Sequence, residues 1–270
     1  MAEHLPIGVF DSGVGGLSVL KALRAELPVE DFVYFADAGF APYGERGDDY
    51  VIGRTRAVVR QLREEHRIKA LVVACNTATA AAIHLIRAEY PALPLVGVEP
   101  ALKPAAAMSQ TGRVAVMGTR GTLASAKFRA LHASLKNQAE FVIVPCDGLA
   151  DAIQNDDATR TGALCERYIG AAGQFGSGKE QIDTLVLGCT HYPFALHHLR
   201  PLVGDAVRLI ETGEPVARQT RRLLEAGGLL RPQAPGVAPG QVTLQTTGEP
   251  ALLETAARRW LGLAREPRRG

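Results

Sequence analysis

Two cysteines of this sequence each end a short apolar run and are followed at once by hydrogen-bonding side chains. Cys75 comes after the run at residues 71–74, and Cys189 comes after the run at residues 185–188. The residues that follow are Asn76 and Thr77 in the first case and Thr190 and His191 in the second. The thiolate is the reactive form of cysteine, and the N–H groups and dipole at the start of a helix favour it. Both thiols are therefore candidates for acid/base or nucleophilic chemistry.

Apolar runs of this length are typical of buried parallel strands, and the polar residues after them are typical of loops that lead into helices. Ligands of open α/β sheets bind at the carboxyl ends of the strands, so both thiols are expected where a ligand binds. Two acid/base groups on opposite faces of one carbon could invert a stereocentre. The other two cysteines, Cys146 and Cys165, are interpreted as inert buried residues.

The composition is that of an ordinary globular protein, with 270 residues, 47% hydrophobic and 21% charged residues and a net charge of +2. This charge argues against a dedicated nucleic-acid surface. Neither a membrane span nor a secretory signal is expected, which favours a cytoplasmic protein with reduced cysteines. Their spacings contain no C-x-x-C pair, so no metal site is expected. The arginines near the end are interpreted as a solvated helix face and tail: Arg258, Arg259, Arg265, Arg268 and Arg269.

Strands and helices alternate along the first half. In order, we expect a strand at 5–10, a glycine loop at 11–16, a helix at 17–27, a strand at 32–36, a loop at 37–47 and a helix at 49–66. After the Cys75 strand, a helix at 78–90 and a strand at 95–98 follow. The loop contains Pro42-Tyr43-Gly44, a turn expected to present an aromatic hydroxyl.

The same pattern then starts again. Residues 114–122 resemble residues 7–13, and three landmarks recur in the same order at offsets of about 107, 114 and 112 residues, which indicates an internal duplication. We predict an α/β fold of two pseudo-symmetric lobes, each a mainly parallel sheet flanked by helices, with the active site in the cleft between them. The predicted domains are residues 1–99 plus 212–270 and residues 100–211. A last strand at 241–246 and helix at 250–261 are expected to return to the first domain.

Two glycine-rich stretches come close to nucleotide-binding motifs without satisfying them. Residues 13–18 place Ser18 where G-x-G-x-x-G requires glycine, and the preceding Asp11 would repel a pyrophosphate. Residues 173–179 are followed by Glu180 instead of Ser or Thr, and they precede a strand where a P-loop follows one. No nucleotide cofactor is expected, and no pyridoxal phosphate either, because no lysine lies in a motif that suggests a Schiff base.

Four separated motifs together resemble the glutamate racemases of bacterial cell-wall synthesis. They are Asp11-Ser12-Gly13 with Gly15-Gly16, Pro42-Tyr43-Gly44, Ala74-Cys75-Asn76-Thr77 and Gly188-Cys189-Thr190-His191. The resemblance runs nearly end to end and includes the late Thr246-Thr247-Gly248. It implies a two-domain α/β fold and interconversion of L- and D-glutamate without a cofactor, supplying D-glutamate for peptidoglycan. The partner it implies is a small-molecule substrate, glutamate; a homodimer is a candidate assembly.

The resemblance also implies roles for individual residues. Cys75 would remove the α-proton of D-glutamate and Cys189 that of L-glutamate, each supplying the proton when the other removes it. Asp11 and His191 would assist these two thiols respectively. A thiol has a reference pKa of about 8.5, so a thiolate and a thiol are expected to coexist near neutral pH. The substrate-binding set would be Asp11, Ser12, Tyr43, Gly44, Asn76, Thr77, Thr190 and His191.

One position departs from the resemblance. Where many members of the family have a glutamate, this chain has Gln154. We therefore expect no carboxylate to assist His191 from this position, and a lower rate in one direction is the resulting hypothesis.

Other activities remain open at this point. Related two-cysteine folds racemise aspartate or hydantoins, and one-cysteine relatives decarboxylate or isomerise diacids. The presence of both cysteines favours inversion, whereas the choice of glutamate depends on the resemblance. A protein of another class, which binds an amino acid for regulation without catalysis, would use the same cleft.

Overall fold

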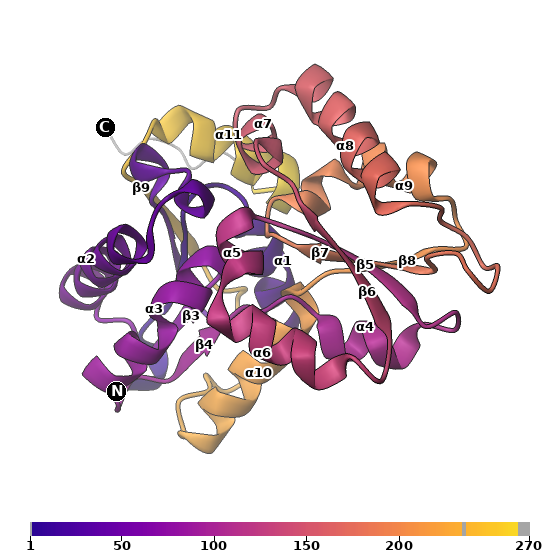
Figure 1. Cartoon of the computed structure of the whole chain (residues 1–270). Coiled ribbons are helices and arrows are strands. Elements are labelled where there is room, and N and C mark those ends of the chain that lie inside the picture. The colour runs from indigo at the N-terminus through magenta and orange to yellow at the C-terminus, as the bar shows by residue number, and fades with distance from the viewer. Residues whose placement is uncertain (1, 234–235, 264–270) are drawn as a thin grey trace.

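The computed structural model describes residues 2–233 and 236–263, and its strands form two parallel sheets in two lobes (Figure 1). The first sheet has the order β4-β3-β1-β2-β9 and the second the order β6-β5-β7-β8. The first contains β1 (Ile7–Asp11), β2 (Phe32–Ala36), β3 (Ala70–Val73), β4 (Leu95–Gly97) and β9 (Val242–Thr246). The second contains β5 (Arg113–Gly118), β6 (Glu140–Pro145), β7 (Thr184–Gly188) and β8 (Arg208–Ile210).

Helices cover both faces of both sheets. Around the first sheet lie α1 (Leu17–Glu26), α2 (Asp48–His66), α3 (Asn76–Glu89), α10 (Gly213–Ala226) and α11 (Pro250–Leu261), which with that sheet form the first lobe. The second lobe contains α4 (Leu102–Met108), α5 (Arg120–Ala124), α6 (Ala126–Leu135), α7 (Leu149–Gln154), α8 (Ala158–Ala172) and α9 (Leu196–Val203). Short 3₁₀ helices are η1 (Ala2–His4), η2 (Ala38–Phe40), η3 (Tyr43–Glu45) and η4 (Tyr192–Ala195). None of the described helices is long and apolar enough to cross a membrane.

The two sheets repeat one strand order, as the duplicated sequence pattern predicts. The order β4-β3-β1-β2 in the first lobe corresponds to the order β8-β7-β5-β6 in the second lobe. All of these strand pairs are parallel. The register agrees as well, because Ile7 pairs with Ala70 and Val114 with Thr184. The α/β fold of two similarly built lobes is therefore confirmed.

The central strand of the first sheet, β1, is buried on both of its faces. Along β1, Ile7 and Val9 pack with α1 and α10, whereas Phe10 packs with α2 and α3. Because side chains alternate along a strand, a run that is apolar at every position can fill both cores. This explains why the strands appear in the sequence as continuous apolar runs.

The C-terminal segment returns to the first lobe, as expected. Strand β9 pairs with β2 in parallel, with Val242 opposite Phe32, and α10 packs against α1. The exact domain limits stay a prediction. The exposed Arg258 and Arg259 on α11 agree with the predicted solvated face, whereas Arg265, Arg268 and Arg269 lie outside the described residues.

A buried ion pair fastens the segment that leads to β9. The Lys69 Nζ lies 2.5 Å from Glu30 Oε2, and both side chains are fully buried. The other carboxylate oxygen of Glu30 accepts the Arg231 N–H at 2.8 Å, and the Arg231 guanidinium binds Asp31 at 2.6 Å. Glu30 therefore joins β3 and the returning segment in one network.

Removing Lys69 should strongly destabilise the protein, because it leaves the Glu30 carboxylate buried without a cation. We expect Lys69→Met to lower the free energy of unfolding in urea by about 3–5 kcal/mol. Lys69→Met combined with Glu30→Leu should recover most of this loss, because neither charge then remains buried. The exposed Lys179→Met is the control and should change stability by less than about 0.5 kcal/mol. Equal effects at Lys69 and Lys179 would contradict the importance of the pair.

Candidate active site

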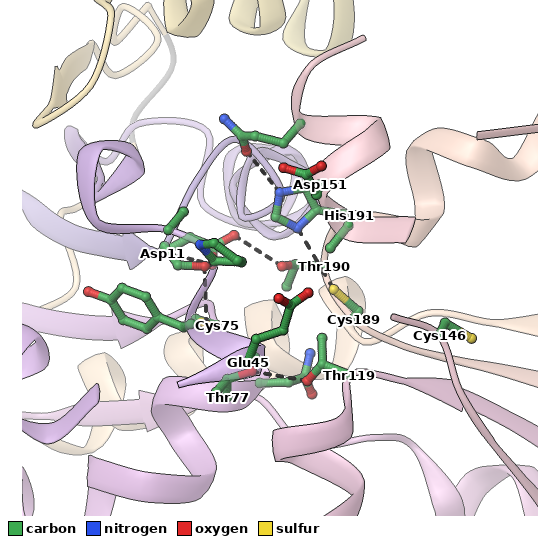
Figure 2. A pocket seen from close by; sticks show the side chains of 18 of the residues that line it. Asp11, Glu45, Cys75, Thr77, Thr119, Cys146, Asp151, Cys189, Thr190 and His191 are labelled. Carbon is green, nitrogen blue, oxygen red and sulfur yellow. Dashed lines mark hydrogen bonds between the residues drawn. The ribbon is translucent and has the colours of Figure 1, made fainter. Parts of the chain in front are cut away.

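All ten residues proposed from the sequence line one cavity between the two lobes, with a volume of about 160 Å³ (Figure 2). Cys75 follows β3 of the first lobe and Cys189 follows β7 of the second, so the thiols enter from opposite sides. The other eight lining residues of the predicted set are Asp11, Ser12, Tyr43, Gly44, Asn76, Thr77, Thr190 and His191.

The Cys75 thiol forms the N-terminal cap of α3. Its Sγ accepts the Ala78 N–H at 3.4 Å and lies 3.7 Å from Ser12 Oγ. The helix therefore begins at Asn76, two residues before the expected start, because the thiol replaces the hydroxyl or carboxylate oxygen that usually caps a helix. Cys75 itself is 5% exposed.

Asp11 ends β1 beside this thiol and connects the two lobes. Its carboxylate accepts the Ser12 N–H at 2.7 Å and the Thr190 hydroxyl at 3.0 Å. Burial raises the pKa of Asp11 to about 7, although hydrogen bonds from its neighbours oppose this rise. A carboxyl group with such a pKa can exchange a proton near neutral pH.

The second thiol has an imidazole partner. Cys189 Sγ lies 3.8 Å from His191 Nδ1, and His191 Nε2 lies 2.9 Å from Gln154 Oε1. Burial lowers the pKa of His191 to about 4, so the ring is neutral at pH 7. Gln154 faces His191, as expected from the sequence. Its side chain is a neutral amide, whereas a glutamate at this position would place a negative charge beside the ring.

The surroundings of Cys75 and Cys189 do not favour the thiolate that was expected at neutral pH. Burial raises the pKa of Cys75 to about 12 and raises that of Cys189 further, and the Asp11 charge adds to both rises. Desolvation therefore outweighs the helix-start N–H groups on which the sequence expectation depended. With the charges of the protein alone, both groups are thiols at pH 7.

The Tyr43 hydroxyl is also placed differently from the expectation. It donates to Asp37 Oδ2 at 2.5 Å, and Asp37 is bound in turn by Arg54 and by the Thr247 hydroxyl. Tyr43 is 1% exposed and lines the cavity, but the hydroxyl that this turn was expected to present is bonded to Asp37. The hydroxyl instead anchors η3, whose Gly44 lines the cavity.

Thr119 is a lining residue that the predicted set lacks. It follows β5, and its hydroxyl lies 3.1 Å from that of Thr77 in the other lobe. The repeat contained a signal for it, because Thr119 occupies in the second half the position of Ser12 in the first. Four charged residues outside the predicted set also line the cavity, and no sequence motif had indicated them: Glu45, Arg120, Asp147 and Asp151.

The remaining thiols lie apart from this chemistry. Cys146 lines the cavity, yet its Sγ donates to the Val144 carbonyl at 3.2 Å and points away from the other labelled side chains (Figure 2). Cys165 is buried in the core of the second lobe. Among the described residues, no three His, Cys, Asp or Glu side chains are grouped so that they could bind one metal ion.

The raised pKa of Cys75 predicts how this thiol reacts with iodoacetamide. The thiolate is the reacting species, so the rate should keep rising with pH through the alkaline range in which the protein stays folded. Asp11→Asn removes a negative charge that raises the Cys75 pKa, so the profile should shift to lower pH. Mass spectrometry of the Cys75 peptide measures the rate, with Cys75→Ser as the control for assignment. A rate that is already constant near neutral pH would contradict this prediction.

Comparisons with known proteins show which family the chain belongs to. The Asp/Glu/hydantoin racemase family model matches residues 7–220. A glutamate racemase of Pseudomonas paraeruginosa is 48% identical over 231 residues, which cover 85% of each chain. One of Methylococcus capsulatus is 49% identical over 238 residues, covering 87% of this chain and 85% of that protein.

Solved structures agree with this result. The structure of glutamate racemase isoform RacE1 from Bacillus anthracis has a TM-score of 0.82 and 32% identity, and the match covers 97% of this chain and 95% of that one. The Escherichia coli glutamate racemase, solved with L-glutamate and the activator UDP-MurNAc-Ala, has a TM-score of 0.79 and 31% identity, with 95% of both chains covered. The chain with two opposed thiols between its lobes therefore belongs to the Asp/Glu/hydantoin racemase family.

Proposed function

We propose that this chain interconverts L- and D-glutamate without a cofactor, using Cys75 and Cys189 as the two bases. The observation that carries the proposal is the entry of two thiols into one cavity from opposite lobes. A carbon held between them can lose its proton to one side and receive a proton from the other. The relatives described above are glutamate racemases, which supports glutamate as the substrate.

The direction of each step follows the family resemblance. Cys75, assisted by Asp11, removes the α-proton of D-glutamate, and Cys189, assisted by His191, removes that of L-glutamate. The substrate ammonium supplies the positive charge that the thiols lack in the protein alone, and an opposite charge nearby lowers the pKa of a thiol. Substrate binding therefore favours the thiolate that proton abstraction needs.

Asn76 supports a polar ligand in this cavity. Its side chain is buried, and neither its amide nitrogen nor its amide oxygen has a hydrogen-bond partner among the described residues. Buried polar atoms are nearly always paired, so a bound carboxylate and ammonium are suitable partners for this amide. We assign substrate binding to Asn76 and to the other members of the predicted set: Asp11, Ser12, Tyr43, Gly44, Thr77, Thr190 and His191.

The wider role we propose is the supply of D-glutamate for peptidoglycan synthesis in the cytoplasm. This role depends on the assignment of glutamate as the substrate. A homodimer is a candidate assembly for the same protein.

Incubation with L-glutamate in D2O, without added cofactor, tests reaction and substrate together. We expect optical rotation to fall to zero while deuterium enters the α position, because each inversion exchanges this proton with a thiol. L-Aspartate in parallel is the substrate control and should react much more slowly. Faster loss of rotation with aspartate would reassign the substrate, and the absence of turnover with both would favour a binding protein.

Replacing either thiol tests the two-base assignment. Cys75→Ser and Cys189→Ser should each lower kcat by about 100-fold or more, because a hydroxyl is a far weaker acid than a thiol. Cys165→Ser, in the core and away from the cavity, is the matched control and should keep activity close to that of the parent. Full activity of either cavity variant would contradict the mechanism.

A further inference from the structure

The glycine loop that follows β1 packs directly against the His191 side of the cavity. A Cβ placed on Gly13 would lie 2.2 Å from Gln154 Oε1, and one on Gly15 would lie 2.3 Å from His191 Nδ1. Heavy atoms do not approach this closely, so only glycine allows these two side chains to pack here. The loop that superficially resembles a dinucleotide motif is thus a contact surface between the lobes.

A chain of hydrogen bonds crosses the lobes at this surface. The Val14 N–H of the first lobe donates to Gln154 Oε1 at 2.8 Å, and the same oxygen lies 2.9 Å from His191 Nε2. A backbone N–H is always a donor, so the Gln154 atom that it meets must be the oxygen. That oxygen can only accept, so His191 Nε2 must carry the hydrogen.

The tautomer of His191 determines whether its Nδ1 presents a lone pair or an N–H to the Cys189 sulfur. A neutral imidazole with hydrogen on Nε2 has a lone pair on Nδ1. Nδ1 is the atom that lies 3.8 Å from Cys189 Sγ, so it can accept the thiol proton. The opposite tautomer would direct an N–H at the sulfur and could not take this proton.

We propose that Val14 and Gln154 form a latch between the lobes that holds His191 as the Nε2–H tautomer and so makes its Nδ1 the proton acceptor for Cys189. The inference deepens the proposed function and rests on it for its kinetic consequence. Gln154 and the Val14 N–H are positioning groups, because they act through His191. Since the latch joins the two lobes, the Cys189 side is complete only when the lobes are closed as they are here.

Other contacts hold the loop after β7, which carries Thr190 and His191, against the first lobe. The Ser18 hydroxyl donates to the Thr190 carbonyl at 2.9 Å, and the Thr190 hydroxyl donates to Asp11. These bonds place the backbone next to His191, whereas the Gln154 amide sets the protonation of its ring. The corresponding Cys75 side has no imidazole, so changes in the latch should affect one side of the reaction.

The first test measures the tautomer itself. Nitrogen-15 NMR of histidine-labelled protein distinguishes the protonated from the unprotonated ring nitrogen, and His191→Asn identifies the resonances. We expect the Nε2–H tautomer in the parent and in Gln154→Glu, which keeps an acceptor oxygen. Gln154→Met, which has none, should lose this preference. Because the measurement needs no turnover, it decides the latch even if glutamate is not the substrate.

The second test assigns the effect to the Cys189 side. The two enantiomers have equal free energies, so kcat/KM must be the same for L- and D-glutamate. A slower proton transfer at Cys189 therefore cannot be detected as a difference in kcat/KM. It is detected as a change in the isotope effect. In Gln154→Met, overall kcat should fall about 10-fold or more. The isotope effect on kcat/KM should rise with α-deuterated L-glutamate and fall with α-deuterated D-glutamate. Gln61→Met on α2, whose amide donates to Glu65, is the matched control and should behave as the parent.

The third test is the pH profile of Gln154→Glu. The titratable groups near His191 are Asp151, which is paired with Arg160 at 2.7 Å, and the neutral Cys189 thiol. A carboxylate at 154 would favour the imidazolium, so the acidic limb of kcat for L-glutamate should move to higher pH by about one unit or more. Below that limb His191 is already protonated and cannot accept the thiol proton.

The latch is overturned by either of two results. One is retention of the Nε2–H tautomer in Gln154→Met. The other is a change of isotope effect that is equal for the two enantiomers, which would indicate a general structural defect. If the parent does not turn over glutamate but its His191 tautomer depends on Gln154, the proposed function fails and the latch stands.

Discussion

Desolvation of two thiols in one interlobe cavity is the constraint on which the rest of this structure depends. Burial raises the pKa of Cys75 and of Cys189 far above neutrality, so neither sulfur is a base by itself. For either sulfur to act as a base, a neighbouring group would have to take its proton. The same burial moves the pKa values of these neighbours, raising that of Asp11 and lowering that of His191, so that both favour their neutral forms. The immediate surroundings of the two thiols therefore carry little fixed charge, so these groups can respond strongly to the charges of a ligand.

The scaffold is symmetric, but the groups that it positions are not. The two sheets share one strand order, and equivalent strands bring Cys75 and Cys189 to opposite walls. The loops after β1 and β5 nevertheless differ, because Asp11 has Gly118 at the equivalent position. One thiol therefore has a carboxyl partner from its own lobe, whereas the other has an imidazole that follows it by two residues. A duplicated fold can supply two opposed faces, and divergence of its loops gives each face a different ionisable neighbour.

Around the cavity, several contacts between the lobes are made where side chains are absent or small. A Cβ on Gly44 would lie 2.8 Å from the Thr119 Cβ, and Gly13 and Gly15 admit Gln154 and His191. Hydroxyl pairs such as Thr77 with Thr119 and the bond from Thr190 to Asp11 complete the contact. The cavity is therefore a property of the assembled lobes, and its protonation states depend on how closely the lobes meet.

The sequence by itself determined the alternation of strands and helices, the duplication, and the two thiols at strand ends, while the family resemblance added the other eight residues of the cavity. These features can be recognised in the sequence because apolar runs, glycine turns and strand-end polar residues are patterns of residues that are close together along the chain. The tertiary structure alone decided the state of these groups. The raised thiol pKa values, the Tyr43 hydroxyl bound to Asp37, and the amide of Gln154 between Val14 and His191 all depend on burial and on partners far away along the chain. Such effects are set by distance in space, and spacing in the sequence contains no measure of that distance.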